Sequence, residues 1–160
     1  MPNARLTIYR GIQMRSRLEA HVARWLDTHP NFRPWEYEPV CFAGVVGQYL
    51  PDFVIHHPTF DSYIEVKPLI VREEELEDAM RRMPVIWESK PGALLGIQLW
   101  DQRREPPGLS ISLYCGPPHR GQGWSVNIQP WVTSGAPETF MWEGAEHFRQ
   151  HAVTRALRVG

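Results

Sequence analysis

The stretch YLPDFVIHHPTFDSYIEVKP, residues 49–68, contains two apolar runs that are typical of neighbouring β-strands. The four residues 57–60 separate the runs and predict an antiparallel hairpin in which Asp52 faces Glu65 directly. Side chains alternate along a strand, so Lys67 is expected on the same face as Glu65. The hairpin therefore predicts three charged side chains close together on a sheet that is otherwise rich in apolar residues.

Asp52 and Glu65 would repel each other if both were charged and nothing lay between them. A divalent cation removes this repulsion, and carboxylate oxygens together with a backbone carbonyl suit Mg²⁺ or Mn²⁺. Lys67 would then be an ammonium beside the ion, able to orient an attacking water and stabilise charge on a phosphoryl group. The alternative is an ordinary half-exposed sheet on which Lys67 neutralises Glu65.

Helical and strand patterns follow one another along the rest of the chain. Leu18, Val22, Trp25 and Leu26 recur at helical spacing before Pro30. The period-two stretch PWEYEPVCF, residues 34–42, is expected to be the first strand of a three-stranded meander. Pro39 within it makes an edge position the expected one, because proline cannot donate a backbone hydrogen bond. We predict helices at 16–27, 72–82 and 143–158, and strands at 34–42, 48–56, 62–68, 93–100, 109–115 and 123–129.

These elements predict an α/β protein with a central mixed sheet flanked by helices, in a single domain spanning residues 1–160. A chain of 160 residues with 42% hydrophobic content can bury a substantial core, which the seven tryptophans are expected to help fill. No apolar run is long enough to span a membrane, and the first residues lack the apolar segment of a secretory signal. A cytoplasmic protein without membrane contact is expected, with Cys41 and Cys115 as reduced thiols.

Pro51-Asp52 followed by Glu65-Val66-Lys67 resembles the signature of the PD-(D/E)XK nuclease superfamily. Together with Glu19 and the strings YEP, YLPDF and YIEVKP, the pattern is more narrowly similar to two groups of enzymes: the N-terminal endonuclease domains of two-component transposases and the phage-type Holliday-junction resolvases. The resemblance covers about residues 15–100 and implies a restriction-endonuclease-like core of order αβββαβ. Residues 101–160 match no pattern of the family and are expected to add a strand pair and a helix.

The resemblance implies a Mg²⁺-dependent DNA endonuclease, a hydrolase that cuts phosphodiester bonds of transposon-end, branched or phage DNA, with Mn²⁺ able to substitute. It implies that Asp52, Glu65, the carbonyl of Val66 and Glu19 bind the metal and that Lys67 assists the water. Glu19 has a second interpretation, because Ser16 and Glu19 also form an S-x-x-E capping box.

Two further groups are candidate substrate contacts. Arg15 and Arg17 belong to an arginine-rich N-terminal segment of a chain whose net charge is −1, so they form either a phosphate-facing patch or a solvated surface. Gln98 lies on a strand expected beside the motif strands, where its amide would position a water or a phosphate, or would be merely structural.

The partners follow from the same resemblance. DNA is the expected substrate, a nearly symmetric duplex favours a homodimer, and a transposase or a phage protein would be the partner protein. The alternative function is a catalytically silent module that keeps the nuclease fold and binds nucleic acid or serves as an accessory or virion component.

Overall fold

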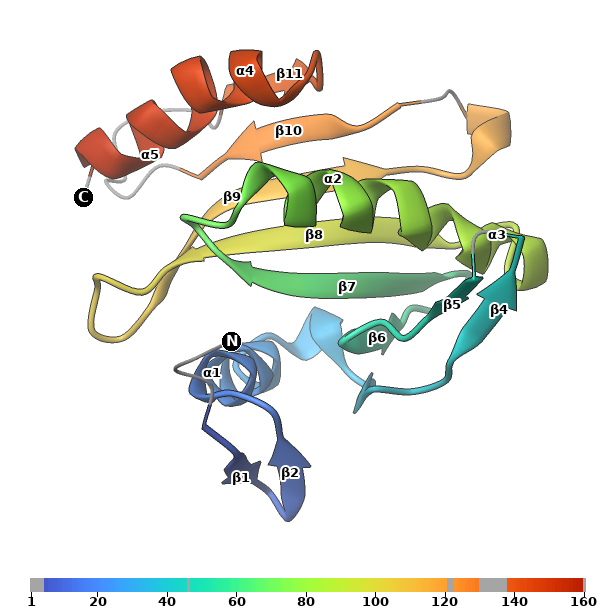
Figure 1. The fold of residues 1–160 in the computed structure, drawn as a ribbon. Coiled ribbons are helices and arrows are strands. Elements are labelled where there is room, and N and C mark those ends of the chain that lie inside the picture. The colour runs from blue at the N-terminus through green and yellow to red at the C-terminus, as the bar shows by residue number, and fades with distance from the viewer. Residues whose placement is uncertain (1–4, 46, 121–122, 130–137, 160) are drawn as a thin grey trace.

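The computed structural model describes residues 5–45, 47–120, 123–129 and 138–159 (Figure 1). At its centre is a seven-stranded sheet of order β11-β10-β9-β8-β7-β6-β3, in which β7 and β8 run parallel and the other pairs antiparallel. Its strands are β3 (Trp35–Tyr37), β6 (Phe53–His56), β7 (Asp61–Pro68), β8 (Leu94–Asp101), β9 (Gly108–Cys115), β10 (Ser125–Ile128) and β11 (Glu138–Met141). The expected α/β protein with a mixed central sheet is confirmed.

The β6–β7 hairpin has the predicted register, with Phe53 opposite Ile64 and His56 opposite Asp61. β3 pairs antiparallel with β6 at the edge of the sheet, so the predicted meander and its edge strand are also confirmed. The register follows from the loop length and from the need to bury one side of each strand.

The strands predicted at 34–42 and 48–56 are wrong in their extent. Glu38 has a φ of 44°, which turns the chain out of β3, and the following Pro39 has no backbone N–H to donate to a ladder. The chain instead forms a separate hairpin of β4 (Phe42–Gly44) and β5 (Gly47–Tyr49), which lies outside the central sheet. Alternation along a sequence does not reveal such an insertion.

One face of the sheet is covered by α1 (Arg17–Asp27), which buries Leu18, Val22 and Leu26 against it. The hydroxyl of Ser16 caps this helix by accepting a hydrogen bond from the backbone N–H of Glu19 at 3.1 Å. A short hairpin that the sequence patterns did not predict, β1 (Thr7–Tyr9) and β2 (Ile12–Met14), packs along the helix. Pro30–Phe32 then forms the 3₁₀-turn η1.

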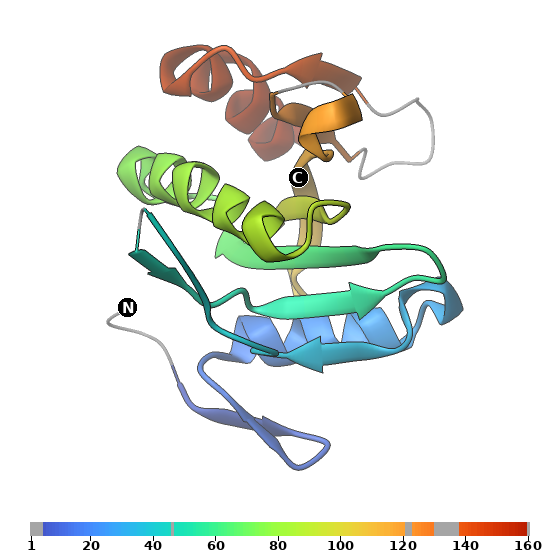
Figure 2. The same cartoon turned by 90° about the vertical axis from the view of Figure 1, so that its right-hand side faces the viewer.

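The opposite face of the sheet is covered by α2 (Glu73–Arg82) and the C-terminal helices. Figure 2 shows α1, in blue, and α2, in green, on either side of the strands. Leu76, Ala79 and Met80 are buried, which confirms the predicted apolar side of α2. This layer also contains η2 (Met83–Val85), α3 (Ile86–Ser89), α4 (Ala145–Phe148), the π-helical turn η4 (Arg149–Val153) and α5 (Thr154–Val159), with η3 (Pro118–Arg120) after β9.

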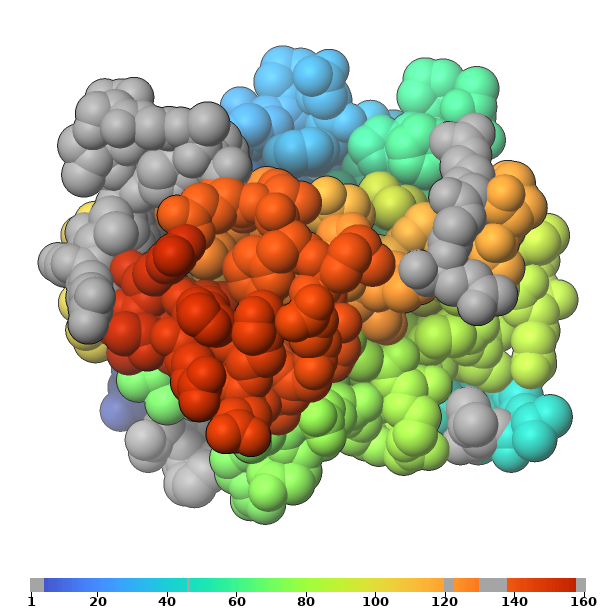
Figure 3. Space-filling view, turned by 90° about the horizontal axis from the view of Figure 1, so that it is seen from above, coloured from blue at the N-terminus to red at the C-terminus, as the bar shows by residue number. Residues whose placement is uncertain are grey.

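The C-terminal elements share the core of the N-terminal ones. Arg149 forms an ion pair with Glu73 at 3.3 Å, and Phe148 and Val153 belong to the same hydrophobic cluster as Leu76. Figure 3 shows the C-terminal helix, in red and orange, beside the green α2 on this face. Strands β9 and β10 form the predicted pair, whereas β11 was not predicted.

The tryptophans contribute to the core as expected where the structure describes them. Trp100 is fully buried, and five others pack partly buried against the two hydrophobic clusters: Trp25, Trp35, Trp87, Trp124 and Trp142. Trp131 lies outside the described residues. Within the described part of the chain, no helix is both long enough and apolar enough to cross a membrane.

Candidate functional site

The β6–β7 hairpin brings together the two carboxyl groups of the motif. The backbone N–H of Asp52 donates to the carbonyl of Ile64 at 3.1 Å, which extends the hairpin beyond the last paired residues. Its side-chain Oδ2 accepts from the backbone N–H of Val66 at 2.7 Å, and its carboxyl group lies beside that of Glu65. Asp52 and Glu65 therefore meet as the sequence predicts.

The pKa of Asp52 is raised well above its usual value. Burial is the largest cause, the hydrogen bond to Glu65 and the charge of Glu65 add to it, and the N–H of Val66 acts in the opposite direction. A second negative charge so close to Glu65 is unfavourable, which favours the neutral form of Asp52. A cation bound between the two carboxyl groups would relieve the same repulsion.

Glu19 approaches this pair from α1. Its side chain is buried, with 9% of the residue exposed, and the hydroxyl of Tyr37 donates to its Oε2 at 2.6 Å. Burial raises the pKa of Glu19, which the hydrogen bonds from Tyr37 and Ser16 partly offset. The charge of Glu19 in turn raises the pKa of Asp52, so the three carboxyl groups form one electrostatic unit.

The capping interpretation of Glu19 accounts for only part of its geometry. The Ser16 hydroxyl accepts from the Glu19 backbone N–H and donates to its Oε1, both at 3.1 Å. A full capping box would also use the Glu19 carboxylate to accept from the backbone N–H of Ser16. Between these two described residues that bond is missing, and the carboxylate is instead directed at Tyr37.

Lys67 lies two residues beyond Glu65 on β7, so both half-buried side chains belong to one face of the strand. Among the described residues Lys67 has no hydrogen-bond or ion-pair partner. No close ion pair between Lys67 and Glu65 is thus seen, and the alternative in which Lys67 only neutralises Glu65 stays a prediction to be tested. Its ammonium group is available for another anion.

Two tyrosines belong to the site although the sequence patterns did not single them out. Besides Tyr37 on β3, Tyr49 on β5 donates its hydroxyl to Oε1 of Glu65 at 3.0 Å. Both lie in the quoted strings YEP and YLPDF. One property of the sequence could have indicated them, because the hydroxyl of a tyrosine inside an apolar run needs a hydrogen-bond partner when it is buried.

The two arginines predicted as substrate contacts lie at the start of α1. The guanidinium of Arg15 pairs with Glu38 at 2.8 Å, and its backbone N–H donates to the Tyr37 hydroxyl at 3.1 Å. Arg17 is exposed as the first residue of the helix. Arg15 thus contacts a side chain that binds Glu19, which puts both arginines at the same end of the molecule as the carboxyl groups.

Gln98 does not join the carboxyl groups. Gln98 is opposite Val66 in the parallel β7–β8 pair, so the two side chains lie on the same face of the sheet. Because neighbouring residues of a strand project to opposite faces, Glu65 and Lys67 lie on the other face. Oε1 of Gln98 accepts from the indole N–H of Trp100 at 3.1 Å. The expected place of its strand beside the motif strands is confirmed, since β8 pairs with β7, and a contact of Gln98 with substrate stays a prediction beside the structural alternative.

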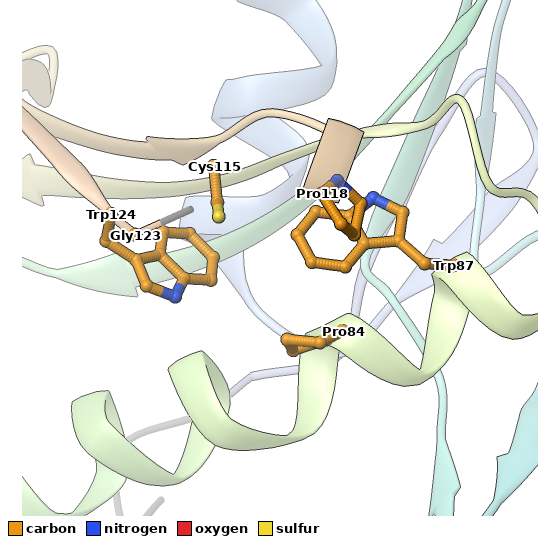
Figure 4. A pocket seen from close by; sticks show the side chains of 6 residues that line it. All are labelled: Pro84, Trp87, Cys115, Pro118, Gly123 and Trp124. Carbon is orange, nitrogen blue, oxygen red and sulfur yellow. The ribbon is translucent and has the colours of Figure 1, made fainter. Parts of the chain in front are cut away.

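The pocket in Figure 4 is a different place. It has a volume of about 230 Å³ and is lined by Pro84, Trp87, Cys115, Pro118, Gly123 and Trp124. None of these side chains is charged, and burial raises the pKa of Cys115 and keeps it a thiol. This pocket offers no ligands for a hard cation and no partner for a phosphate.

The donor set of the carboxyl cluster fits a hard divalent cation in kind, because it consists of carboxylate oxygens beside a backbone segment. Within the described residues, however, no group of three or more His, Cys, Asp or Glu side chains is arranged to hold a metal ion.

In comparisons with protein-family models, curated proteins and solved structures, no match to this chain was found. The function is therefore argued from the residues of this site and from the resemblance of its motif.

Proposed function

We propose that this protein is a metal-dependent DNA endonuclease that hydrolyses phosphodiester bonds. The observation that carries the proposal is the close approach of the Asp52 and Glu65 carboxyl groups, with Lys67 on the same face of β7 as Glu65 and without an ion-pair partner among the described residues. Two carboxyl groups this close form a site where a divalent cation gains from both. The element order α1, β3, β6, β7, α2, β8 supports a restriction-endonuclease-like core, αβββαβ, interrupted by the β4–β5 hairpin.

Asp52 and Glu65 would hold one or two Mg²⁺ ions, or Mn²⁺ in their place, with the carbonyl of Val66 and the side chain of Glu19 as further ligands. The ion would polarise the phosphoryl group and activate water. Both carboxyl groups would have to be deprotonated to act as ligands of such an ion. The N–H of Val66 would hold Oδ2 of Asp52 in place in that site.

Lys67 would orient the attacking water and stabilise the charge that develops on the phosphoryl oxygens. An ammonium group suits this role because it is compact and has three donors that rotate freely. Of the 17 basic residues of the chain, only Lys67 and Lys90 are lysines. Arg15 and Arg17 would contact phosphates next to the one that is cut, from the start of α1.

The decisive experiment is a cleavage assay on supercoiled plasmid, linear duplex, single strands and a four-way junction. Each substrate is incubated with Mg²⁺, Mn²⁺ or EDTA. We expect metal-dependent cutting of at least one substrate and its loss in Asp52→Asn, and the substrate that is cut distinguishes branched DNA from ordinary duplex. Cutting that continues in EDTA, or equally in Asp52→Asn, would contradict the proposal.

A catalytically silent nucleic-acid-binding or accessory module is the second candidate. It is favoured by the finding that the described carboxyl side chains are not arranged to hold a metal. In that case DNA binding would persist without metal-dependent cutting of any substrate. A homodimer, or a transposase or phage partner, would suit either function, and co-purification with sizing of the complex tests both.

A further inference from the structure

Two tyrosine hydroxyl groups donate hydrogen bonds to the acidic residues of the site, each to a different carboxylate. Tyr37 donates to Oε2 of Glu19 at 2.6 Å, and Tyr49 donates to Oε1 of Glu65 at 3.0 Å. The tyrosines come from β3 and β5, which belong to different sheets. Two independent elements thus supply the same type of contact to two of the three carboxyl side chains.

Each contact restricts the carboxylate that receives it. A carboxylate can turn about its last side-chain bond, and a hydrogen bond to one oxygen removes most of this freedom. With Oε1 of Glu65 held by Tyr49, Oε2 is the oxygen left for another partner. The Glu19 side chain is held at Oε2 by Tyr37 and more loosely at Oε1 by the rotatable Ser16 hydroxyl.

Tyr49 is itself firmly placed. It is buried, with 6% of its surface exposed, and the guanidinium of Arg82 on α2 binds the carbonyl of the preceding Gln48. At the other end of the hairpin, a Cβ added to Gly44 would lie 2.1 Å from Cγ2 of Val85, so β4 packs closely on the helical layer. The inserted β4–β5 hairpin is thereby held where it directs one hydroxyl at Glu65.

Tyr37 is held in a comparable way. Its ring packs edge-on against Phe53 with centroids 5.4 Å apart, and its hydroxyl accepts from the backbone N–H of Arg15 at 3.1 Å. That hydroxyl therefore accepts from the segment that leads into α1 and donates to Glu19 on the same helix. Edge strand β3 and the start of α1 are joined at this one atom.

We infer that Tyr37 and Tyr49 are positioning residues, which limit the orientations that Glu19 and Glu65 adopt as ligands of a divalent cation. The inference rests on the proposed function, since it assigns these carboxylates to a metal. Partners that orient metal ligands typically change metal affinity by about 10- to 100-fold when they are removed. A merely structural tyrosine would affect folding stability instead.

The test uses Tyr37→Phe and Tyr49→Phe, which remove one hydroxyl each and keep the ring. Tyr63→Phe is the matched control, because Tyr63 is a buried tyrosine of β7 that packs on Phe42 and contacts no carboxylate by hydrogen bond among the described residues. Mn²⁺ binding is measured by titration calorimetry on the full chain without DNA, and melting curves show that each variant is folded.

We expect Mn²⁺ affinity to fall by about 10- to 100-fold in Tyr37→Phe and in Tyr49→Phe and to stay unchanged in Tyr63→Phe. Raising the Mn²⁺ concentration should then restore cleavage by both variants, because the ligands are present and only less well oriented. Wild-type Mn²⁺ affinity in both variants would overturn the inference. If Asp52→Asn still abolished binding in that experiment, the metal site would stand and only the positioning role would fail.

Discussion

The carboxyl groups of Asp52 and Glu65 lie beside each other at the start of the β6–β7 hairpin, and the N–H of Val66 donates to Oδ2 of Asp52 at 2.7 Å. Two carboxyl groups placed this close inside a protein mark a position where positive charge is favourable. Glu19 on α1 adds a third acid nearby, and Lys67, which has no ion-pair partner among the described residues, adds a positive charge on β7.

Divalent metal should stabilise the folded protein. Millimolar Mn²⁺ or Mg²⁺ is expected to raise the melting temperature, because an ion that binds only the folded state contributes about 2.7 kcal/mol at 100 times its dissociation constant. Asp52→Asn should remove most of this shift. Thermal melts with and without metal provide the measurement, and a wild-type curve that does not respond would count against a carboxylate metal site.

Lys67→Arg should lose on the order of 10²-fold in cleavage rate while stability and DNA binding change little. The guanidinium is planar, wider and always charged, so it does not reproduce a compact ammonium beside a water molecule. Lys90→Arg is the matched control, because Lys90 is exposed at the end of α3. Normal cleavage by Lys67→Arg would remove Lys67 from the mechanism.

Glu19→Gln should keep the melting temperature while cleavage falls steeply. The amide oxygen can still accept from Tyr37, and its NH₂ group can donate to the Ser16 hydroxyl, but the negative charge that a hard cation needs is lost. Glu19→Ala should cost roughly 1–3 kcal/mol, since it leaves the Tyr37 hydroxyl without its acceptor. If Glu19→Gln cuts DNA normally, Glu19 serves only the helix.

His56 should make stability depend on pH. It lies between Glu36 on β3 and Asp61 on β7, and these hydrogen bonds, that to Glu36 first, raise its pKa above the usual 6.5. A raised folded-state pKa gives stability that is fully present below about pH 6.5 and is lost as pH rises through the folded value. The contribution should not exceed about 1 kcal/mol, because the imidazole is partly exposed.

Comparison of wild type with His56→Gln by denaturant unfolding between pH 5 and pH 9 measures this contribution. The stability difference should be largest at the acidic end and shrink as the pH increases. A difference that is constant over the range would show that the pKa of His56 is the same in the folded and unfolded states.

Gln98→Ala should leave metal-dependent cleavage unchanged. Gln98 lies on the face of the sheet opposite Glu65 and Lys67, where it accepts from Trp100. The same cleavage assay tests this, with Lys67→Arg as the comparison on the other face. A strong loss of rate without a loss of stability would mean that Gln98 itself takes part in substrate binding or cleavage.

Local rules determined the centre of the site. The length of the loop between β6 and β7 and the alternation of apolar residues set the hairpin register, and the register alone brings Asp52 to Glu65 and aligns Lys67 with it. The helical spacing of Leu18, Val22, Trp25 and Leu26 similarly predicted α1, on which Glu19 is found buried. These relationships connect residues that are close in sequence or lie on one regular element.

Contacts between distant elements were decided only by the tertiary structure. Glu38 turns the chain out of β3 and makes room for the inserted hairpin that carries Tyr49 to Glu65, and the parallel pairing of β7 with β8 puts Gln98 on the opposite face. The choice of Tyr37 over the Ser16 N–H as partner of Glu19 also depends on how β3 packs on α1. Periodicity reports which side of an element is buried, whereas the partner on that side depends on packing between elements that no single stretch of sequence encodes.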